Sequence, residues 1–391
     1  MNTYAPKLLI LWVAVFAALA LSACGGGGAG KPVEATFHVE DPPMLSDWGI
    51  YSVANGAVEL SPGVVPFDLN STLFTDYAHK LRTIWIPGGK GGAYRENDYP
   101  DFPVGTVISK TFYYPRPEAS AGAFDGRISK SDQPSGEVDP ALRDLSSVRL
   151  VETRLLVRRD KGWSALSYIW NDRQTDAVLK KIGDAKPMTL VSADGTETNF
   201  TYIVPNTNQF EGCHATNNTT RQIGPLGVRP RHLNKDFTYG DGTTNQIDHL
   251  AMIGYLTEAA PSATAPRNAD WTDTTLPADV RARAYLDINC SHCHNPVGPA
   301  DTSGLFLTLD TPTGPSLGLC KLPIAAGAGT GGRRYDIVPG NPEHSILPFR
   351  METIDPGSMM PELGRSLPHT EAVSVIRQWI TEMEGECPSA G

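Results

Sequence analysis

No apolar run in the sequence is long enough to cross a bilayer as a helix. The longest run, residues 8–20, falls well short of the roughly 20 residues that a spanning helix needs. Basic residues are also scarce, because 33 Lys and Arg stand against 43 Asp and Glu. This balance argues against binding to nucleic acid or to anionic lipid headgroups. We find no nucleotide-binding glycine-rich turn, no flavin signature and no catalytic triad.

The N-terminus is typical of a secreted chain. Lys7 precedes the apolar run, which ends in the small residues before Cys24, as in a signal peptide. The ending "LSAC" resembles a bacterial lipoprotein signal, in which residues 1–23 are removed and Cys24 is lipidated. An ordinary signal peptide with an incidental cysteine is the alternative. Removal of residues 1–23 takes away one Lys and no acid, so the net charge of −10 becomes −11.

We therefore expect an exported lipoprotein on the periplasmic side, anchored to the outer membrane rather than the inner one. Acyl chains on one residue can hold a soluble domain at a membrane. The stretch "GGGGAG" after Cys24 has the composition of a flexible linker. Residues 24–60 are accordingly expected to form a tether that leads into the first domain.

Residues 61–205 predict an antiparallel β domain, a sandwich or a barrel. Glycine and proline are abundant, at 38 and 32 residues, which favours turns and short strands. The expected strands are rich in β-branched and aromatic residues and cover residues 82–87, 105–114, 149–159, 163–170 and 199–205. Residues 171–183 are expected to form one short helix. Alternation in 149–159 predicts one buried face and one wet face, with Glu152 and Arg154 on the wet one.

The strongest motif is C-x-x-C-H, formed by Cys290, Cys293 and His294. Two thiols at this spacing can each form a thioether to one edge of a haem, and the adjacent histidine then becomes an axial ligand of the iron. A thioredoxin-like redox pair and a zinc site are the rival uses of C-x-x-C. The histidine that follows and the absence of a βαβ pattern argue against the first. No convincing second ligand pair supports the second.

The flanks of the motif predict an all-α domain over residues 265–391. Residues 278–289 read as a short amphipathic helix that enters the motif, with Val280, Ala284 and Tyr285 on its buried side. Residues 369–384 form a closing helix, capped by Thr370, whose Trp379 is expected to pack against the entering helix.

Met360 is the expected sixth ligand of the iron, with Met359 as the alternative. It lies 66 residues after His294, which is enough chain to return to the other face of a haem. His/Met ligation is the usual arrangement for electron transfer. Arg333 and Arg334 could neutralise haem propionates, although a solvated loop explains them equally well.

Residues 206–264 connect the two domains and contain the pair Cys213 and His214. Phe210 stands where a second cysteine would complete another C-x-x-C-H. Three states are open, namely a haem on one thioether through Cys213 with His214 as ligand, a haem held without a covalent bond, and an empty site. A helix is expected from about residue 245 to 256. A haem on His214 would need a second iron ligand, and His232, His249 and Met252 are the residues available in this segment. Each is more readily interpreted as a structural or solvated residue than as a ligand.

Cysteine accounting predicts one disulfide. Cys24 is assigned to lipid, and Cys290 and Cys293 are assigned to haem. Cys320 and Cys387 are left over in an oxidising compartment, where spare thiols pair. Two separate thiols are the alternative.

Residues 265–390 resemble a class I c-type cytochrome domain. A wider resemblance, to a family of bacterial diheme c-type cytochrome lipoproteins of unassigned role, covers most of the mature chain and rests on residues 64–78, 102–115, 151–158, 168–177, 204–214, 288–296, 298–307 and 333–347. In that family the segment matching residues 210–214 carries a full C-x-x-C-H, so Phe210 departs from its pattern.

The sequence thus predicts an α+β multidomain protein with one haem c, and it leaves a second haem open. The expected function is a membrane-tethered cytochrome that passes single electrons between redox protein partners. The alternative is a haem-containing oxidoreductase, in which the β domain holds a substrate and the cytochrome domain removes the electrons. A surface module with a vestigial haem site is disfavoured by the intact motif.

Overall fold

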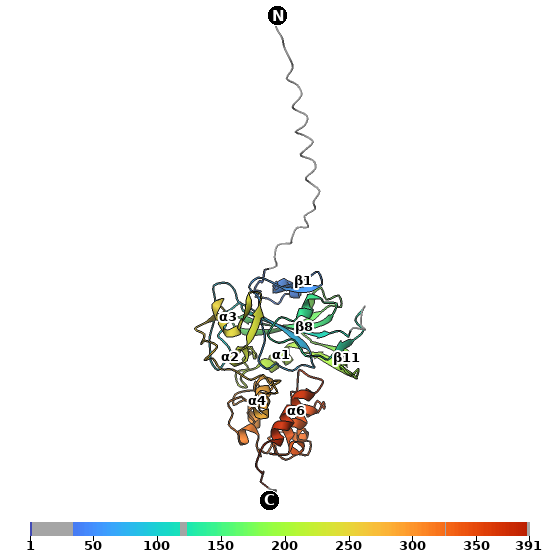
Figure 1. Ribbon diagram of the computed structural model, residues 1–391, viewed down its shortest axis with the longest axis vertical. Helices are drawn as coiled ribbons and strands as arrows, with labels where there is room; N and C mark the ends of the chain where they lie inside the picture. Colours follow the sequence, from blue (N-terminus) through green and yellow to red (C-terminus); the bar gives the residue numbers. More distant parts are fainter. Residues whose placement is uncertain (2–33, 118–122, 325, 389–391) are drawn as a thin grey trace. The chain divides into compact units, whose positions relative to one another are not determined.

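The computed structural model describes residue 1 and residues 34–117, 123–324 and 326–388. The protein is α+β, with antiparallel β-sheets in the N-terminal part followed by a C-terminal region with few helices (Figure 1). The predicted signal peptide and the predicted lipidated Cys24 lie outside the described residues.

The β part is built on a six-stranded antiparallel sheet with the order β10-β9-β8-β6-β4-β3. Its strands are β3 Val65–Phe67, β4 His79–Trp85, β6 Val107–Pro115, β8 Val148–Arg159, β9 Gly162–Trp170 and β10 Ala177–Leu179. A three-stranded sheet contains β7 Arg127–Ser129, β11 Asp184–Val191 and β12 Glu197–Val204, in which β11 and β7 run parallel. The short pairs are β1 Tyr51–Ala54 with β2 Ala57–Leu60, β13 Asp236–Tyr239 with β14 Gly242–Asn245, and β5 Gly92–Ala93 with β15 Leu256–Thr257. Residues 171–183, expected to be helical, instead contain β10, and β11 begins directly after them.

Both faces of the six-stranded sheet are buried, so the predicted wet face of residues 149–159 is wrong. One face carries Leu155 and Val157 into a core with the N-terminal segment. The other carries Leu156 into a core that includes residues of the connecting segment. Glu152 is fully buried and the Arg154 side chain is 11% exposed, because later parts of the chain cover the face that alternation assigns to solvent.

The expected tether is also wrong for residues 44–60. A 3-10 helix, η1 Leu45–Trp48, and the β1–β2 hairpin fold onto the sheet. Trp48 has no exposed surface, and its Nε1 donates a 2.8 Å hydrogen bond to the Tyr168 hydroxyl. The first domain therefore begins upstream of the predicted boundary at residue 61.

The α-helices are α1 Thr207–His214, α2 Pro230–Leu233, α3 Gln246–Met252, α4 Ala278–Asn289, α5 Ile346–Glu352 and α6 Thr370–Thr381. The 3-10 helices besides η1 are η2 Pro140–Arg143, η3 Asp301–Ser303, η4 Pro315–Leu317, η5 Gly327–Thr330 and η6 Pro342–His344. Within the described ranges, no helix has both the length and the apolar character that crossing a membrane requires.

The two predicted helices around the motif are present as α4 and α6, and they pack against each other (Figure 1). Trp379 is 5% exposed and lies in the core that both helices share, as expected. Val280, expected on the buried side, is 37% exposed. His369 rather than Thr370 occupies the N-cap of α6, and its side chain makes no capping hydrogen bond.

Hydrogen bonds join the β part to the C-terminal region. The Asn289 side chain accepts a 2.8 Å bond from the Phe74 amide and donates to the Thr72 carbonyl. The Arg231 guanidinium binds both oxygens of Asp287, at 2.7 and 3.0 Å. The end of α4 is thus fastened to the β part.

Candidate functional site

A cavity of about 380 Å³ lies at the C-terminal end of α4. Its volume falls in the range of small-molecule and cofactor pockets. Cys290, Cys293, His294 and Met360 all line it, and Met359 does not. The structure therefore brings together the four residues that the sequence selected for one haem.

Local backbone geometry places the motif at the cavity wall. Cys290 is the C-cap of α4, and its carbonyl accepts hydrogen bonds from the amides of Cys293, at 3.1 Å, and His294, at 3.0 Å. This tight turn brings the two cysteines and the histidine to one side of the chain. Both cysteines are free. Burial raises the pKa of Cys290 to about 12 and that of Cys293 to about 11, so both are neutral thiols near pH 7.

The ring of His294 has one nitrogen engaged by the protein. Its Nδ1 lies 3.3 Å from the Leu305 carbonyl, which is an acceptor and so fixes the proton on Nδ1. Burial lowers the pKa of His294, so the neutral tautomer with a lone pair on Nε2 is favoured. A histidine held through one ring nitrogen in this way is typical of metal ligands.

The methionine segment is held by a buried arginine that the sequence reasoning missed. Arg365 is 6% exposed. Its guanidinium donates to the carbonyl of Met360 at 3.1 Å and to those of Arg350 and Thr353 at 3.0 and 2.9 Å. The Met360 amide in turn donates to the Arg350 carbonyl at 2.8 Å. The position of Arg365, five residues after Met360, was the one sequence signal that could have pointed to this role.

The β part also holds this segment, through Asp76. One oxygen of this carboxylate accepts the amides of Ser366 and Leu367, at 2.7 and 2.8 Å. Burial raises the pKa of Asp76 to about 6, although these hydrogen bonds oppose the shift. Asp76 lies nearly 300 residues before its partners, so no local sequence pattern points to it.

Cys213 and His214 line different cavities. Helix α1 is capped by Asn206 and Gln209, which bond reciprocally to each other's amides, a capping box. At its other end, Cys213 lines the large cavity together with Cys290 and Cys293. His214 instead lines a cavity of about 50 Å³, and its Nδ1 lies 2.9 Å from the Gly224 carbonyl.

The surroundings of His214 do not fit a second haem. The small cavity is far below the volume of a cofactor pocket, and a thioether through Cys213 would lie in the other cavity. Among the described residues, His232 lies 3.5 Å from Asp287, and His249 stacks on Tyr239 at 3.6 Å between ring centroids. Met252 is 67% exposed. None of these three lines the cavity of His214.

The cations at the large cavity differ from those expected. Lys321 and Arg350 line it, whereas Arg333 and Arg334 do not. Arg333 lies over the ring of Phe349 and donates to the Glu343 carbonyl. The sequence reasoning also passed over His292, inside the motif, which lines the cavity. Burial lowers its pKa to about 4, so it is neutral near pH 7.

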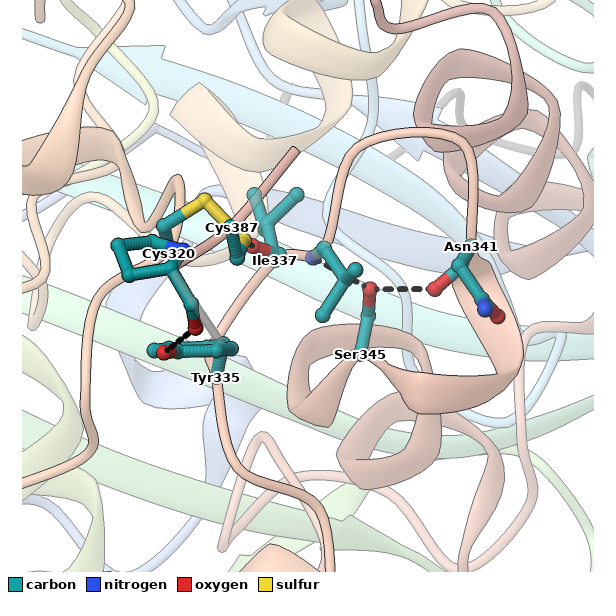
Figure 2. Close-up of a disulfide and its surroundings, with 8 residues drawn as sticks. Cys320, Tyr335, Ile337, Asn341, Ser345 and Cys387 are labelled. Carbon is teal, nitrogen blue, oxygen red and sulfur yellow. Dashed lines mark hydrogen bonds between the residues drawn. A yellow bond between two sulfur atoms is a disulfide. The ribbon is translucent and has the colours of Figure 1, made fainter. Parts of the chain in front are cut away.

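Cys320 and Cys387 form a disulfide with an S–S distance of 2.05 Å (Figure 2), which is the pairing that the sequence predicts. The bond ties the segment after α6 to the chain beside Lys321. Nearby, the Tyr335 hydroxyl donates a 2.8 Å hydrogen bond to the Pro388 carbonyl. The Ser345 hydroxyl, also drawn in Figure 2, links the Val338 amide to the Asn341 carbonyl.

Comparison with protein-family models, with curated proteins and with solved structures gives no match to this chain. Among the residues that the structure describes, no group of three or more His, Cys, Asp and Glu side chains is arranged to hold a metal ion.

Proposed function

We propose that this protein is an exported, membrane-anchored c-type cytochrome that transfers single electrons through one covalently held haem. The observation that carries the proposal is the shared cavity of about 380 Å³, which Cys290, Cys293, His294 and Met360 all line. A haem there would supply one-electron redox chemistry. Cys290 and Cys293 would hold it through thioethers, and His294 and Met360 would be the ligands of its iron.

The residues of the chain prepare the cavity for this role in three ways. Both thiols are free rather than paired with each other, so each is available for a thioether. His294 keeps Nε2 free for iron because Nδ1 is engaged by Leu305. The Met360 backbone is fixed on both sides, since its amide donates to the Arg350 carbonyl and its carbonyl accepts from the Arg365 guanidinium. Preorganised ligands of this kind hold a metal centre with little rearrangement.

The partners would be redox proteins that dock from the periplasmic side, with the lipid on Cys24 as the membrane anchor. The net charge of −11 after removal of the signal peptide favours a basic partner.

The first experiment measures the haem-to-protein ratio of the mature protein produced with a cytochrome maturation system. We expect one covalent haem per chain and a low-spin spectrum. The variant Cys290→Ala/Cys293→Ala should carry no covalent haem after denaturation and acid extraction. Covalent haem that survives in this variant and disappears when Cys213 is also changed would contradict the assignment of a single site.

The second experiment compares the two methionines. The ferric protein should show a weak sulfur-to-iron band in the far red. Met360→Ala should abolish this band and lower the reduction potential, because loss of a thioether ligand removes its stabilisation of the ferrous state. Met359→Ala is the matched control and should keep the band, since Met359 does not line the cavity. The opposite result would assign the ligand to Met359.

A further inference from the structure

A row of three cations crosses the six-stranded sheet beneath α1. Arg82 on β4 is paired in register with Lys110 on β6, and Lys110 is paired with Arg154 on β8. Directly paired residues share one face of a sheet, so the three side chains lie side by side. They line the small cavity of about 50 Å³ together with His214 and Phe210. No acidic side chain among the described residues lines it.

The nearby carboxylates are already engaged by other groups. Glu152 binds Arg154 at 2.9 and 2.6 Å and also accepts from the Tyr202 hydroxyl at 2.7 Å. Asp68 lies 3.2 Å from Nη1 of Arg82 and 2.8 Å from Lys235. Glu152 is therefore paired with Arg154, and Asp68 is shared by Arg82 and Lys235. Neither carboxylate is paired with Lys110.

Two donors at the cavity are left without partners. The Arg82 side chain is 3% exposed. Its Nη2 is buried and has no hydrogen-bond partner. Lys110 makes no hydrogen bond or ion pair within the described chain, where its ammonium lies 5.2 Å from the ring of Phe112. Burial, with the charges of Arg154 and Arg82, lowers the pKa of Lys110 to about 7. Lys110 is partly buried, whereas Nη2 of Arg82 is fully buried. A buried charged donor without a partner is costly, so the arrangement favours entry of a group that accepts hydrogen bonds from these donors.

The cavity has room for such a group. A single water needs only about 10–15 Å³ of this kind of volume, so about 50 Å³ accommodates a small ion with several heavy atoms. Guanidinium and ammonium donors on two adjacent strands can reach different oxygens of one oxyanion. The apolar side chains of Ile108, Leu156 and Val228, which complete the wall, restrict the size of the occupant.

We propose that this cavity binds a small inorganic oxyanion, with Nη2 of Arg82 and Nζ of Lys110 as the donors. The bound ion neutralises the excess positive charge of the row and satisfies both free donors. The site is separate from the large cavity and does not depend on a haem. A free amine or guanidinium that served only to hold the fold would already have a carboxylate or carbonyl partner.

The test uses the full mature chain and sodium nitrate as the probe, at constant ionic strength maintained with a bulky organic salt. Isothermal titration calorimetry should show saturable binding of one nitrate per chain. Lys110→Met should weaken binding at least tenfold. Lys161→Met, at the exposed turn between β8 and β9, is the matched control and should bind like the unmodified protein.

Thermal unfolding separates this site from a merely structural role for Lys110. Without nitrate, Lys110→Met should melt at or above the temperature of the unmodified protein, because an unpaired, partly buried charge is replaced by an apolar chain of similar length. With nitrate, the midpoint should rise for the unmodified protein and for Lys161→Met but not for Lys110→Met. Absence of saturable nitrate binding, equal binding in Lys110→Met, or a lower midpoint of Lys110→Met without nitrate would overturn the proposal.

Discussion

Removal of the Cys320–Cys387 bond should destabilise the protein by an amount that its loop length sets. The two cysteines are 67 residues apart in the sequence. In the chain-entropy model, a closed loop of this length restricts the unfolded state by about 4 kcal/mol at 25 °C. The perturbation is the double variant Cys320→Ser/Cys387→Ser, which avoids leaving one reactive thiol.

The assay is urea unfolding without reductant, followed by far-ultraviolet circular dichroism. With a urea dependence of about 3 kcal/mol per molar for a chain of this size, the midpoint should fall by roughly 1.5 M. Cys213→Ser is the control, because Cys213 is a free thiol and its replacement breaks no disulfide. It should cost less than about 1 kcal/mol.

Two results would refute the reasoning. A midpoint of the double variant equal to that of Cys213→Ser would show that the loop does not restrict the unfolded chain. Peptide mapping that links Cys320 to a cysteine other than Cys387 would show that the compared variants test the wrong bond. Reduction of the unmodified protein should reproduce the stability of the double variant.

Two further predictions concern single side chains. Burial raises the folded-state pKa of Asp76 to about 6, from about 4 in the unfolded chain. Stability should therefore be highest below pH 4 for this group and fall by up to about 3 kcal/mol as pH rises through 6. Asp76→Asn should remove that part of the pH dependence, and an unchanged profile would contradict it. Trp379→Ala should cost about 3–5 kcal/mol in urea unfolding, because Trp379 is 5% exposed in the core shared by α4 and α6; a loss under 1 kcal/mol would show that the core closes over the gap.

Local patterns were sufficient for the motif and its flanking helices. C-x-x-C-H is a contiguous signal, and the apolar spacing around Trp379 specifies the buried side of a helix without reference to the rest of the chain. The disulfide followed from compartment and cysteine count. The sequence preferred Met360 to Met359, and the structure separates the two because only Met360 lines the cavity.

The N-terminal hairpin was missed although its signal was present. Asn55-Gly56 lies between β1 and β2, and both residues adopt positive φ, 51° and 75°. This dipeptide is a strong hairpin indicator when it is flanked by strands. Because of the Gly-rich stretch after Cys24, the tether was predicted to extend too far along the chain, to residue 60. The burial of Trp48 against the sheet is visible only in the tertiary structure.

The full burial of Glu152 and the partial burial of Arg154 and Lys110 could not be read from strand alternation. A period of two tells which residues share a face, but not whether another segment covers that face. Here α1, more than 50 residues further along the chain, lies over it, with the Phe210 ring 5.6 Å from the Arg154 guanidinium. The same packing directs His214 toward the cationic row, which adjacency in sequence to Cys213 does not suggest.

The β part contributes directly to the site that the C-terminal motif forms. Asn289 adjoins Cys290 and is bonded to Phe74 and Thr72 of the β part. Cys213 supplies a wall of the large cavity from α1, and Asp76 fixes the residues that follow Met360. The proposed haem site therefore has several supports that lie before residue 265. Because the supports through Asn289 and Asp76 are hydrogen bonds that are wholly or partly buried, their loss leaves unsatisfied polar groups at both ends. The site and the β part are therefore expected to form and unfold as one unit.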